Sequence, residues 1–247
     1  MENPGPRIET EQVVTLCFFR FRGVRDKIWA FAQMALARRP LRGLPGVGFV
    51  KLMGAGTGEG FTPIPDTGVV AVLTTWPDLA TAAKQTTDSQ VFARYRARAA
   101  EAFTLHMTPI SARGVWSGVA PFRPGAARPG PVAALTRATI RPRVLWRFWG
   151  RVPDISARIG ADGNVLFKAG VGELPWLHQV TFSIWPDAAA MAAFARADGP
   201  HAAAIRAVRA EGWFAEELYA RFTLRAHSGS WNGINPLARA CPALAAE

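Results

Sequence analysis

The chain has 247 residues, of which 49% are apolar, so it can form one large domain or two small ones with a substantial core. Its formal net charge is +11, but the arginines are scattered and no nucleic-acid-binding signature accompanies them. We interpret the charge either as a solvated basic surface or as attraction to an anionic membrane surface, and we expect no nucleic-acid partner.

The cysteine content and the hydropathy pattern indicate an intracellular protein. Two cysteines, Cys17 and Cys241, provide no disulfide framework, which fits a reducing compartment. The N-terminus has no apolar signal core, and no stretch is apolar enough to span a bilayer. We therefore predict a cytoplasmic location. The helix expected over 28–37, followed by Arg38 and Arg39, could lie in a membrane interface or pack on its own sheet.

Strand and helix patterns alternate along the chain. Strands are expected over 13–21, 47–53, 69–76 and 105–116, with helices over 25–39 and 79–103. After a Pro- and Gly-rich linker over 119–131, strands are expected over 132–140, 164–168, 176–185 and 220–226. Helices are expected over 143–159 and in two segments after Trp185, and Glu216 and Glu217 are interpreted as a solvated helix face. Residues 1–12 are predicted to be a flexible leader and 236–247 a flexible tail.

Four markers recur in the same order in both halves. They are a first-helix Trp at 29 and 146, Gly-x-Gly-Glu at 56–59 and 170–173, Trp-Pro-Asp at 76–78 and 185–187, and Trp-x-Gly at 116–118 and 231–233. We therefore predict two tandem βαββαβ repeats of the ferredoxin-like type, over 13–118 and 132–235. Each sheet would carry helices on one face, and its other face would pack against the sheet of the other repeat. The expected fold is an α+β barrel within one chain, with a cavity between the sheets.

The motifs exclude several kinds of site. The glycines of 54–60 do not open a helix, so they do not match the dinucleotide fingerprint, and we interpret them as a close backbone approach or a tight turn. The four histidines are widely spaced, without Glu-x-x-His, which disfavours di-iron and histidine-box sites. The distant cysteines disfavour zinc. A haem remains compatible, because it needs one axial ligand.

Two histidines are the candidates for that ligand. His201 comes first, because it lies in the first turn of a helix beside small residues that leave room for a flat macrocycle. His178 comes second, since it lies within a strand and could face the cavity from either side of a haem. For each, the alternative is a histidine with satisfied hydrogen bonds in the core or at a helix end.

Long blocks of the chain resemble one family. They are GAGTGEGFTPIPD (54–66), FRPGAARPGPVAALTRATIRP (122–142), RFWGRVPDIS (147–156), ELPWLHQVTFSIWPD (173–187) and DGPHAAAIRAVRAEGWFAEELYARF (198–222). From Val13 to Asn235 the chain resembles the spheroidene monooxygenase family, the acyclic-carotenoid 2-ketolases of purple phototrophic bacteria. The resemblance implies an oxygen-dependent enzyme that converts spheroidene to spheroidenone by two hydroxylations at C2. It also implies haem b as cofactor, a ferredoxin-type electron donor, and a place in the cytoplasm or at the inner photosynthetic membrane.

The implied chemistry assigns roles to particular residues. By analogy with haem-degrading enzymes of ferredoxin-like fold, His201 would bind the iron, and His178 would act in catalysis. Arg147 and Arg151 would pair with haem propionates, although lipids or a ferredoxin could use the same charges. The carotenoid channel would be lined by Trp146, Phe148, Trp149, Trp176, Phe182, Trp213 and Phe214. Two alternatives are a non-catalytic module that binds a carotenoid or haem, and a cofactor-free monooxygenase.

Overall fold

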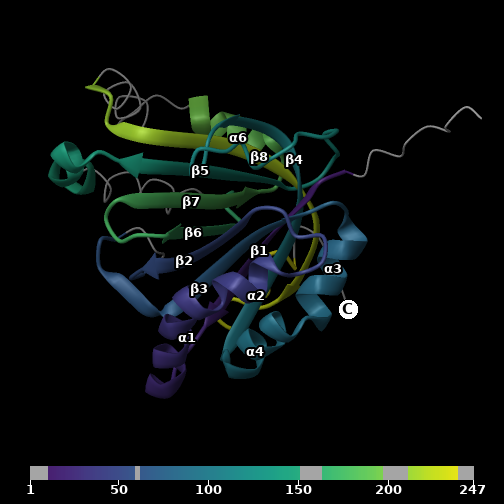
Figure 1. The fold of residues 1–247 in the computed structure, drawn as a ribbon. Helices are drawn as coiled ribbons and strands as arrows, with labels where there is room; N and C mark the ends of the chain where they lie inside the picture. Colours follow the sequence, from purple (N-terminus) through teal and green to yellow (C-terminus); the bar gives the residue numbers. More distant parts are fainter. Residues whose placement is uncertain (1–10, 59–61, 151–162, 197–210, 239–247) are drawn as a thin grey trace, which may run out of the picture.

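Eight antiparallel strands close into a barrel in the computed structural model, which describes residues 11–58, 62–150, 163–196 and 211–238. The strand order around the barrel is β1-β3-β2-β6-β7-β5-β8-β4 (Figure 1). The strands are β1 (Val13–Arg20), β2 (Val50–Gly56), β3 (Pro65–Trp76), β4 (Glu101–Gly114), β5 (Val132–Ile140), β6 (Phe167–Gly172), β7 (His178–Trp185) and β8 (Phe214–Gly229).

Each half of the chain contributes one ferredoxin-like sheet to the barrel. The order is β4-β1-β3-β2 in the first half and β8-β5-β7-β6 in the second, so equivalent strands occupy equivalent places. The prediction of two βαββαβ repeats in an α+β barrel is confirmed. The first strand of each repeat is central in its sheet, and β1 is buried on both faces, which explains its nearly unbroken apolar sequence.

Two seams join the sheets. The β4–β8 seam is long and runs from Phe103 opposite Gly229 to Gly114 opposite Leu218. The β2–β6 seam is short, and Gly54 lies opposite Gly172 within it. A Cβ atom on Gly172 would lie 2.0 Å from the carbonyl oxygen of His178, so this position requires glycine. The close approach that requires glycine is thus between the end of β6 and the start of β7, within the second repeat, whereas a Cβ atom on Gly54 would meet nothing within 4 Å.

Helices cover the outside of the barrel. On one side lie α1 (Val24–Leu36), α2 (Arg38–Arg42), α3 (Leu79–Asp88) and α4 (Gln90–Arg98), and on the opposite side lies α6 (Ala188–Arg196) (Figure 1). The 3-10 helix η1 spans Pro142–Val144. The Trp-Pro-Asp motif ends a strand and starts a helix in both repeats. Asp78 accepts a hydrogen bond from the Thr81 amide, and Asp187 accepts one from the Ala190 amide.

Several predicted boundaries were wrong. The helical segment over 79–103, for which two pieces were considered, is divided at Ser89 into α3 and α4, but it ends at Arg98, and the next strand begins at Glu101 rather than at 105. The strand expected over 220–226 begins at Phe214, so Glu216 and Glu217 lie on β8 and not on a helix. In both places the segment pairs with a strand of its own repeat, β4 with β1 and β8 with β5. This pairing outweighs the local preference for helix, which is weak.

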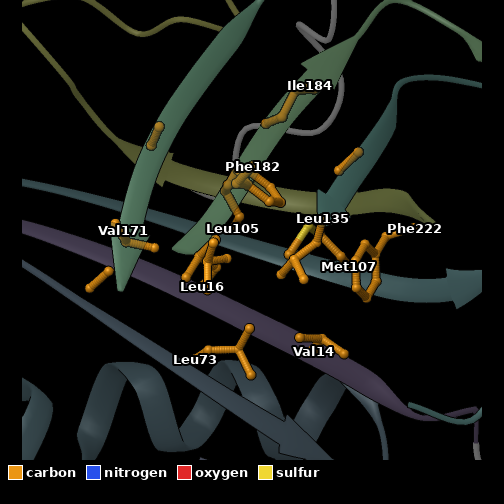
Figure 2. Close-up of a cluster of buried hydrophobic side chains, with 14 of the residues drawn as sticks. Val14, Leu16, Leu73, Leu105, Met107, Leu135, Val171, Phe182, Ile184 and Phe222 are labelled. Carbon is orange, nitrogen blue, oxygen red and sulfur yellow. The ribbon is translucent and has the colours of Figure 1, made fainter. Parts of the chain in front are cut away.

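The space between the sheets is filled by side chains from both repeats. Leu16, Leu73 and Leu105 from the first repeat meet Leu135, Phe182 and Phe222 from the second (Figure 2). The expected cavity is therefore confined to one end of the barrel, where about 290 Å³ remains beside Arg20, Val69 and Trp231. Close packing explains this, because an empty apolar interior forfeits dispersion contacts.

The predicted linker has neither helix nor strand over residues 120–131, yet it is packed against the barrel. Phe122 is buried with its ring centroid 5.1 Å from that of Phe222. The side-chain amide of Gln12 makes two hydrogen bonds to this segment. Its nitrogen donates to the Pro121 carbonyl, and its oxygen accepts from the Arg123 amide. The connection between the repeats is thus held at one end of the barrel.

Candidate functional site

The histidines differ sharply in their surroundings. His106 is buried, with Nε2 3.2 Å from the Thr86 hydroxyl, and burial lowers its pKa to about 4. His227 is fully buried. His178 is partly exposed and borders a groove on the surface. His201, the first predicted iron ligand, lies outside the described residues. Among the described histidines, only His178 is open to a ligand.

The groove lies along the β2–β6 seam, between α1 and the turn that connects β6 to β7. Its volume is about 240 Å³, and its lining is mainly apolar. The residues on its walls include Phe31, Met34, Trp149, Leu174, Pro175 and Trp176. Such a mostly apolar recess with a few polar groups at its base is typical of a binding site for an apolar molecule.

Trp176 is held at the groove in a constrained position. Its backbone φ is 67°, in the left-handed region that a bulky residue rarely adopts. The indole of Trp176 donates to the Pro63 carbonyl at 2.7 Å, and the indole of Trp149 donates to the Trp176 carbonyl at 3.1 Å. Both ends of the residue are therefore fixed from across the groove. Backbone strain of this kind is concentrated at functional sites.

His178 connects the groove with a charged cluster that we call the polar end of the barrel. The polar end consists of Lys51, Arg137, Glu173, His178 and Glu216. Nδ1 of His178 is buried, makes no hydrogen bond within the described residues, and lies 3.6 Å from Glu173 Oε2. Burial lowers the pKa of His178, Arg137 and Lys51 act in the same direction, and Glu173 and Glu216 oppose them.

Glu173 is the centre of the polar end. It accepts a hydrogen bond from Lys51 Nζ at 2.6 Å and another from the Trp116 indole at 2.6 Å. Arg137, whose side chain is 2% exposed, lies 4.0 Å from Glu173 and pairs with Glu216. Glu173 therefore stays fixed beside His178 whether or not the imidazole is charged.

Glu216 connects the polar end to the Trp-x-Gly turn of the first repeat. Ser117 and Gly118 both have positive φ, and their amides donate to the two Glu216 oxygens at 2.8 Å each. Burial opposes ionisation of Glu216, but these two amides and Arg137 outweigh it, so the pKa is lowered. The second repeat thereby closes the end of the first.

The structure distributes the predicted channel residues over four places. Trp149 and Trp176 meet at the groove. Phe148, Trp213 and Phe214 form a separate cluster with Ile140 and Val144. Phe182 is buried inside the barrel, and Trp146 is 93% exposed.

The predicted propionate partners are placed only in part. Arg147 pairs with Glu211 at 2.8 Å, and its guanidinium lies over Trp213. Arg151 lies outside the described residues.

Sequence reasoning missed several residues of this region. Phe31 and Met34 of α1 were not predicted to line a site, and Arg38 stands at the same groove. Nor did sequence reasoning predict that Lys51 and Glu173 belong to the charged cluster around His178. One available signal was the Glu that ends Gly-x-Gly-Glu, five residues before His178.

The described residues show neither a metal-binding cluster nor a membrane-spanning helix. Within those residues, no group of three or more His, Cys, Asp or Glu side chains is placed to hold a metal ion. None of the described helices is both long enough and apolar enough to cross a bilayer.

Sequence comparison identifies close relatives. Spheroidene monooxygenase of Rhodobacter capsulatus is 54% identical over 230 residues, which cover 92% of this chain and 95% of that protein. Spheroidene monooxygenase of Cereibacter sphaeroides is 46% identical over 96% of this chain and 74% of its own length. No family model matches the chain.

Structural comparison gives a distant likeness in fold. A crystal structure of aldoxime dehydratase superposes with a TM-score of 0.60 at 10% identity, covering 88% of this chain and 82% of that one. At this identity the likeness concerns the fold alone.

Proposed function

The chain belongs to the spheroidene monooxygenase family, and on this premise we propose that it oxidises C2 of spheroidene and related acyclic carotenoids. Two successive hydroxylations at C2 would give a gem-diol, which loses water to leave the ketone of spheroidenone. In each hydroxylation one atom of O2 enters the C–H bond and the other leaves as water. The electron pair required for each step is assigned to reduced ferredoxin.

The groove beside His178 is the observation that carries this proposal. A carotenoid is a long apolar hydrocarbon, and the groove offers it aromatic walls from Phe31, Trp149 and Trp176. The groove opens at the surface, so a chain longer than the recess can extend beyond it. Because the Trp149 indole is hydrogen-bonded to the Trp176 carbonyl and the Trp176 indole to the Pro63 carbonyl, the substrate would meet a shaped surface rather than mobile side chains.

Two features of the groove support a haem with one axial histidine. The buried Nδ1 of His178 faces the Glu173 carboxylate, which can hold the proton on that nitrogen and leave Nε2 as the ligand atom. Arg38 at the groove supplies a cation suited to a propionate. We therefore propose haem b as the cofactor, which when bound would activate O2 for attack on an unactivated C–H bond. His201 competes with His178 for the ligand role, as Arg147 and Arg151 compete with Arg38 for the propionates.

Haem binding is tested by supplying haem to the purified protein. A Soret band and a stoichiometric pyridine haemochrome are expected. His178→Gln and His201→Gln are then compared, and the variant that loses haem with an unchanged far-UV CD spectrum identifies the axial ligand. A protein that stays folded but takes up no haem would contradict the cofactor assignment.

Activity is tested by co-expression in a cell that accumulates spheroidene. Conversion of the pigment to the red ketocarotenoid supports the enzyme. Protein that carries unchanged carotenoid would indicate a binding module instead, and turnover in protein stripped of haem and iron would indicate a cofactor-free monooxygenase.

A further inference from the structure

Helix α1 exposes a stripe of large apolar side chains. Val24, Ile28 and Phe31 are spaced by four and three residues, so they lie on one face of the helix, and they are 74%, 65% and 74% exposed. Leu36 at the end of the helix is 66% exposed. Trp29, Ala30 and Met34 already pack against the barrel. The exposed stripe therefore contributes little to the packing of the fold.

The stripe leads directly to the groove. Phe31 belongs both to the stripe and to the groove wall, and across the groove Leu174 and Trp176 are 47% and 57% exposed. We call these residues together with Val24, Ile28 and Leu36 the apolar rim. An exposed apolar patch of this kind around the mouth of a site marks a surface that meets another apolar phase.

The two helices beside the groove carry exposed arginines. Arg25 follows Val24 on α1, Arg38 borders the groove at the start of α2, and α2 adds Arg39 and Arg42. In the described part of the chain none of these four forms an ion pair, and the one acidic residue of α1, Asp26, pairs with Arg98. The surface that α1 and α2 present therefore combines exposed apolar side chains with exposed cations.

We propose that α1, α2 and the apolar rim dock on an anionic lipid bilayer, so that the groove opens into the bilayer and takes its substrate from there. Apolar side chains would enter the boundary between headgroups and acyl chains, and the arginines would meet lipid phosphates. The route of the substrate rests on the proposed function, because it requires a molecule dissolved in the acyl layer. The docking itself rests only on the surface.

Charge favours a bilayer over a second copy of the chain. A symmetric dimer places the same patch of each subunit against itself. Here it would bring Arg25, Arg38, Arg39 and Arg42 of the two subunits together, while the nearby Asp26 and Glu173 already pair with Arg98 and Lys51. Anionic phosphates instead complement these cations.

The docking is tested by co-sedimentation of the full chain with vesicles of phosphatidylglycerol and phosphatidylcholine in equal parts, and with phosphatidylcholine alone. Binding is expected to the anionic vesicles and to fall as sodium chloride is raised to about 0.5 M, where the screening length is a few ångströms. Val24→Ser with Ile28→Ser should reduce the partition coefficient by roughly tenfold, since two exposed apolar side chains no longer enter the lipid. The control is Val119→Ser, which removes a 49% exposed valine outside α1 and the groove.

Two outcomes would overturn the docking surface. One is equal binding of the wild type and the Val24/Ile28 variant. The other is elution of the wild type as a dimer that this variant dissociates, which would show that a second copy covers the rim. Because vesicle binding is measured without turnover, its result stands even if no carotenoid is oxidised. With turnover present, the variant should lose activity toward spheroidene in vesicles and retain it toward spheroidene in detergent.

Discussion

The two ends of the barrel are built from equivalent parts but are filled differently. At each end a glutamate near the start of the last strand receives the amide of a Trp-x-Gly turn from the other repeat. Glu216 holds the turn at Gly118, and Glu101 holds the turn at Gly233. An arginine pairs with each glutamate, Arg137 in the first case and Arg20 in the second. Each end of the barrel is therefore closed by the same three parts, a Trp-x-Gly turn, a glutamate and an arginine.

The arginines reach their glutamates from different depths. Arg20 lies directly opposite Glu101, whereas Thr139 lies opposite Glu216, so Arg137 sits two residues further inside the barrel. The side chain of Arg137 is accordingly 2% exposed and that of Arg20 is 27% exposed. A buried cation requires more partners than an exposed one, and Glu173 supplies the second carboxylate.

Other equivalent positions at the two ends of the barrel also differ in charge and size. His178 is opposite Thr139 and Val69 is opposite Arg20, so valine replaces histidine at the second end. Lys51 lies opposite Leu73, and Ala169 lies opposite Phe182, the equivalent residue of the second repeat, so Lys51 and Ala169 also occupy equivalent positions. Val69 and Ala169 both border the cavity beside Arg20. Divergence after duplication thus gave one end a charged cluster and left the other end a void.

Removal of the two arginines should have unequal effects. Arg137→Ala leaves Glu216 and Glu173 partly buried without their shared cation, and we expect a loss of about 3 kcal/mol in the free energy of unfolding. Arg20→Ala, the matched control, removes a cation that is 27% exposed and leaves one carboxylate, Glu101, which keeps its hydrogen bond from the Gly233 amide, so we expect a smaller loss of about 1 to 2 kcal/mol. Urea denaturation of both variants measures the difference. Equal losses would mean that burial does not distinguish the two ends.

Enlarging an interior alanine should distinguish the void from the packed centre. Ala133 is fully buried in the barrel interior, and Ala133→Leu should cost about 2 kcal/mol through overpacking. Ala169→Leu places the same added volume next to the cavity and should change stability by less than about 1 kcal/mol. The midpoints of thermal unfolding of the two variants give the comparison, and a larger loss for Ala169→Leu would contradict the position of the void.

Neutralising Glu173 should weaken the polar end without an equivalent at the other end. Glu173→Gln removes the negative charge beside the Lys51 ammonium, which keeps as acceptors the Ser117 hydroxyl and the neutral amide oxygen of the new side chain. We expect a loss of about 1 to 2 kcal/mol and a further decrease in the pKa of His178, because Glu173 raises it. Chemical denaturation and an NMR titration of the imidazole measure the two effects. An unchanged His178 titration would exclude the contact.

Replacing His178 with the valine of the other end should remove a small pH dependence. The unfolded chain gains this proton near pH 6.5, whereas the folded protein gains it only at lower pH. The unfolded state thus binds more protons below pH 6.5, and stability falls there as the pH is lowered. His178→Val should flatten this part of the profile relative to the wild type, as seen in unfolding free energies across pH 5 to 7. Parallel profiles would show that His178 titrates normally.

Local patterns were sufficient for much of the fold. The Trp-Pro-Asp and Trp-x-Gly markers predicted the repeats because each has a local cause, a helix N-cap at Asp78 and Asp187 and a turn with positive φ at Ser117 and Asn232. The start of β8 was missed because Glu216 and Glu217 have no strand preference of their own. They are on a strand because β5 pairs with them.

The candidate site was predictable only in its residue types. Trp149, Trp176 and His178 were singled out because rare aromatic and titratable side chains cluster there in the sequence. Phe182 was grouped with them; it shares a face of β7 with His178 but lies four residues further along the strand, in the packed core. Phe31 and Lys51 lie more than a hundred residues away in sequence, and no local pattern connects them with His178.

The sequence by itself determined the duplication, most strand and helix types and the spheroidene monooxygenase family. Short local patterns indicate the first two, and long contiguous blocks of sequence indicate the family. The tertiary structure alone decided which end of the barrel became charged, where the void remained and which face of α1 stayed exposed. These depend on register and closure, which bring Lys51, Arg137 and Glu173 together from three strands or turns of both repeats. Their charges are compatible with burial only in that arrangement.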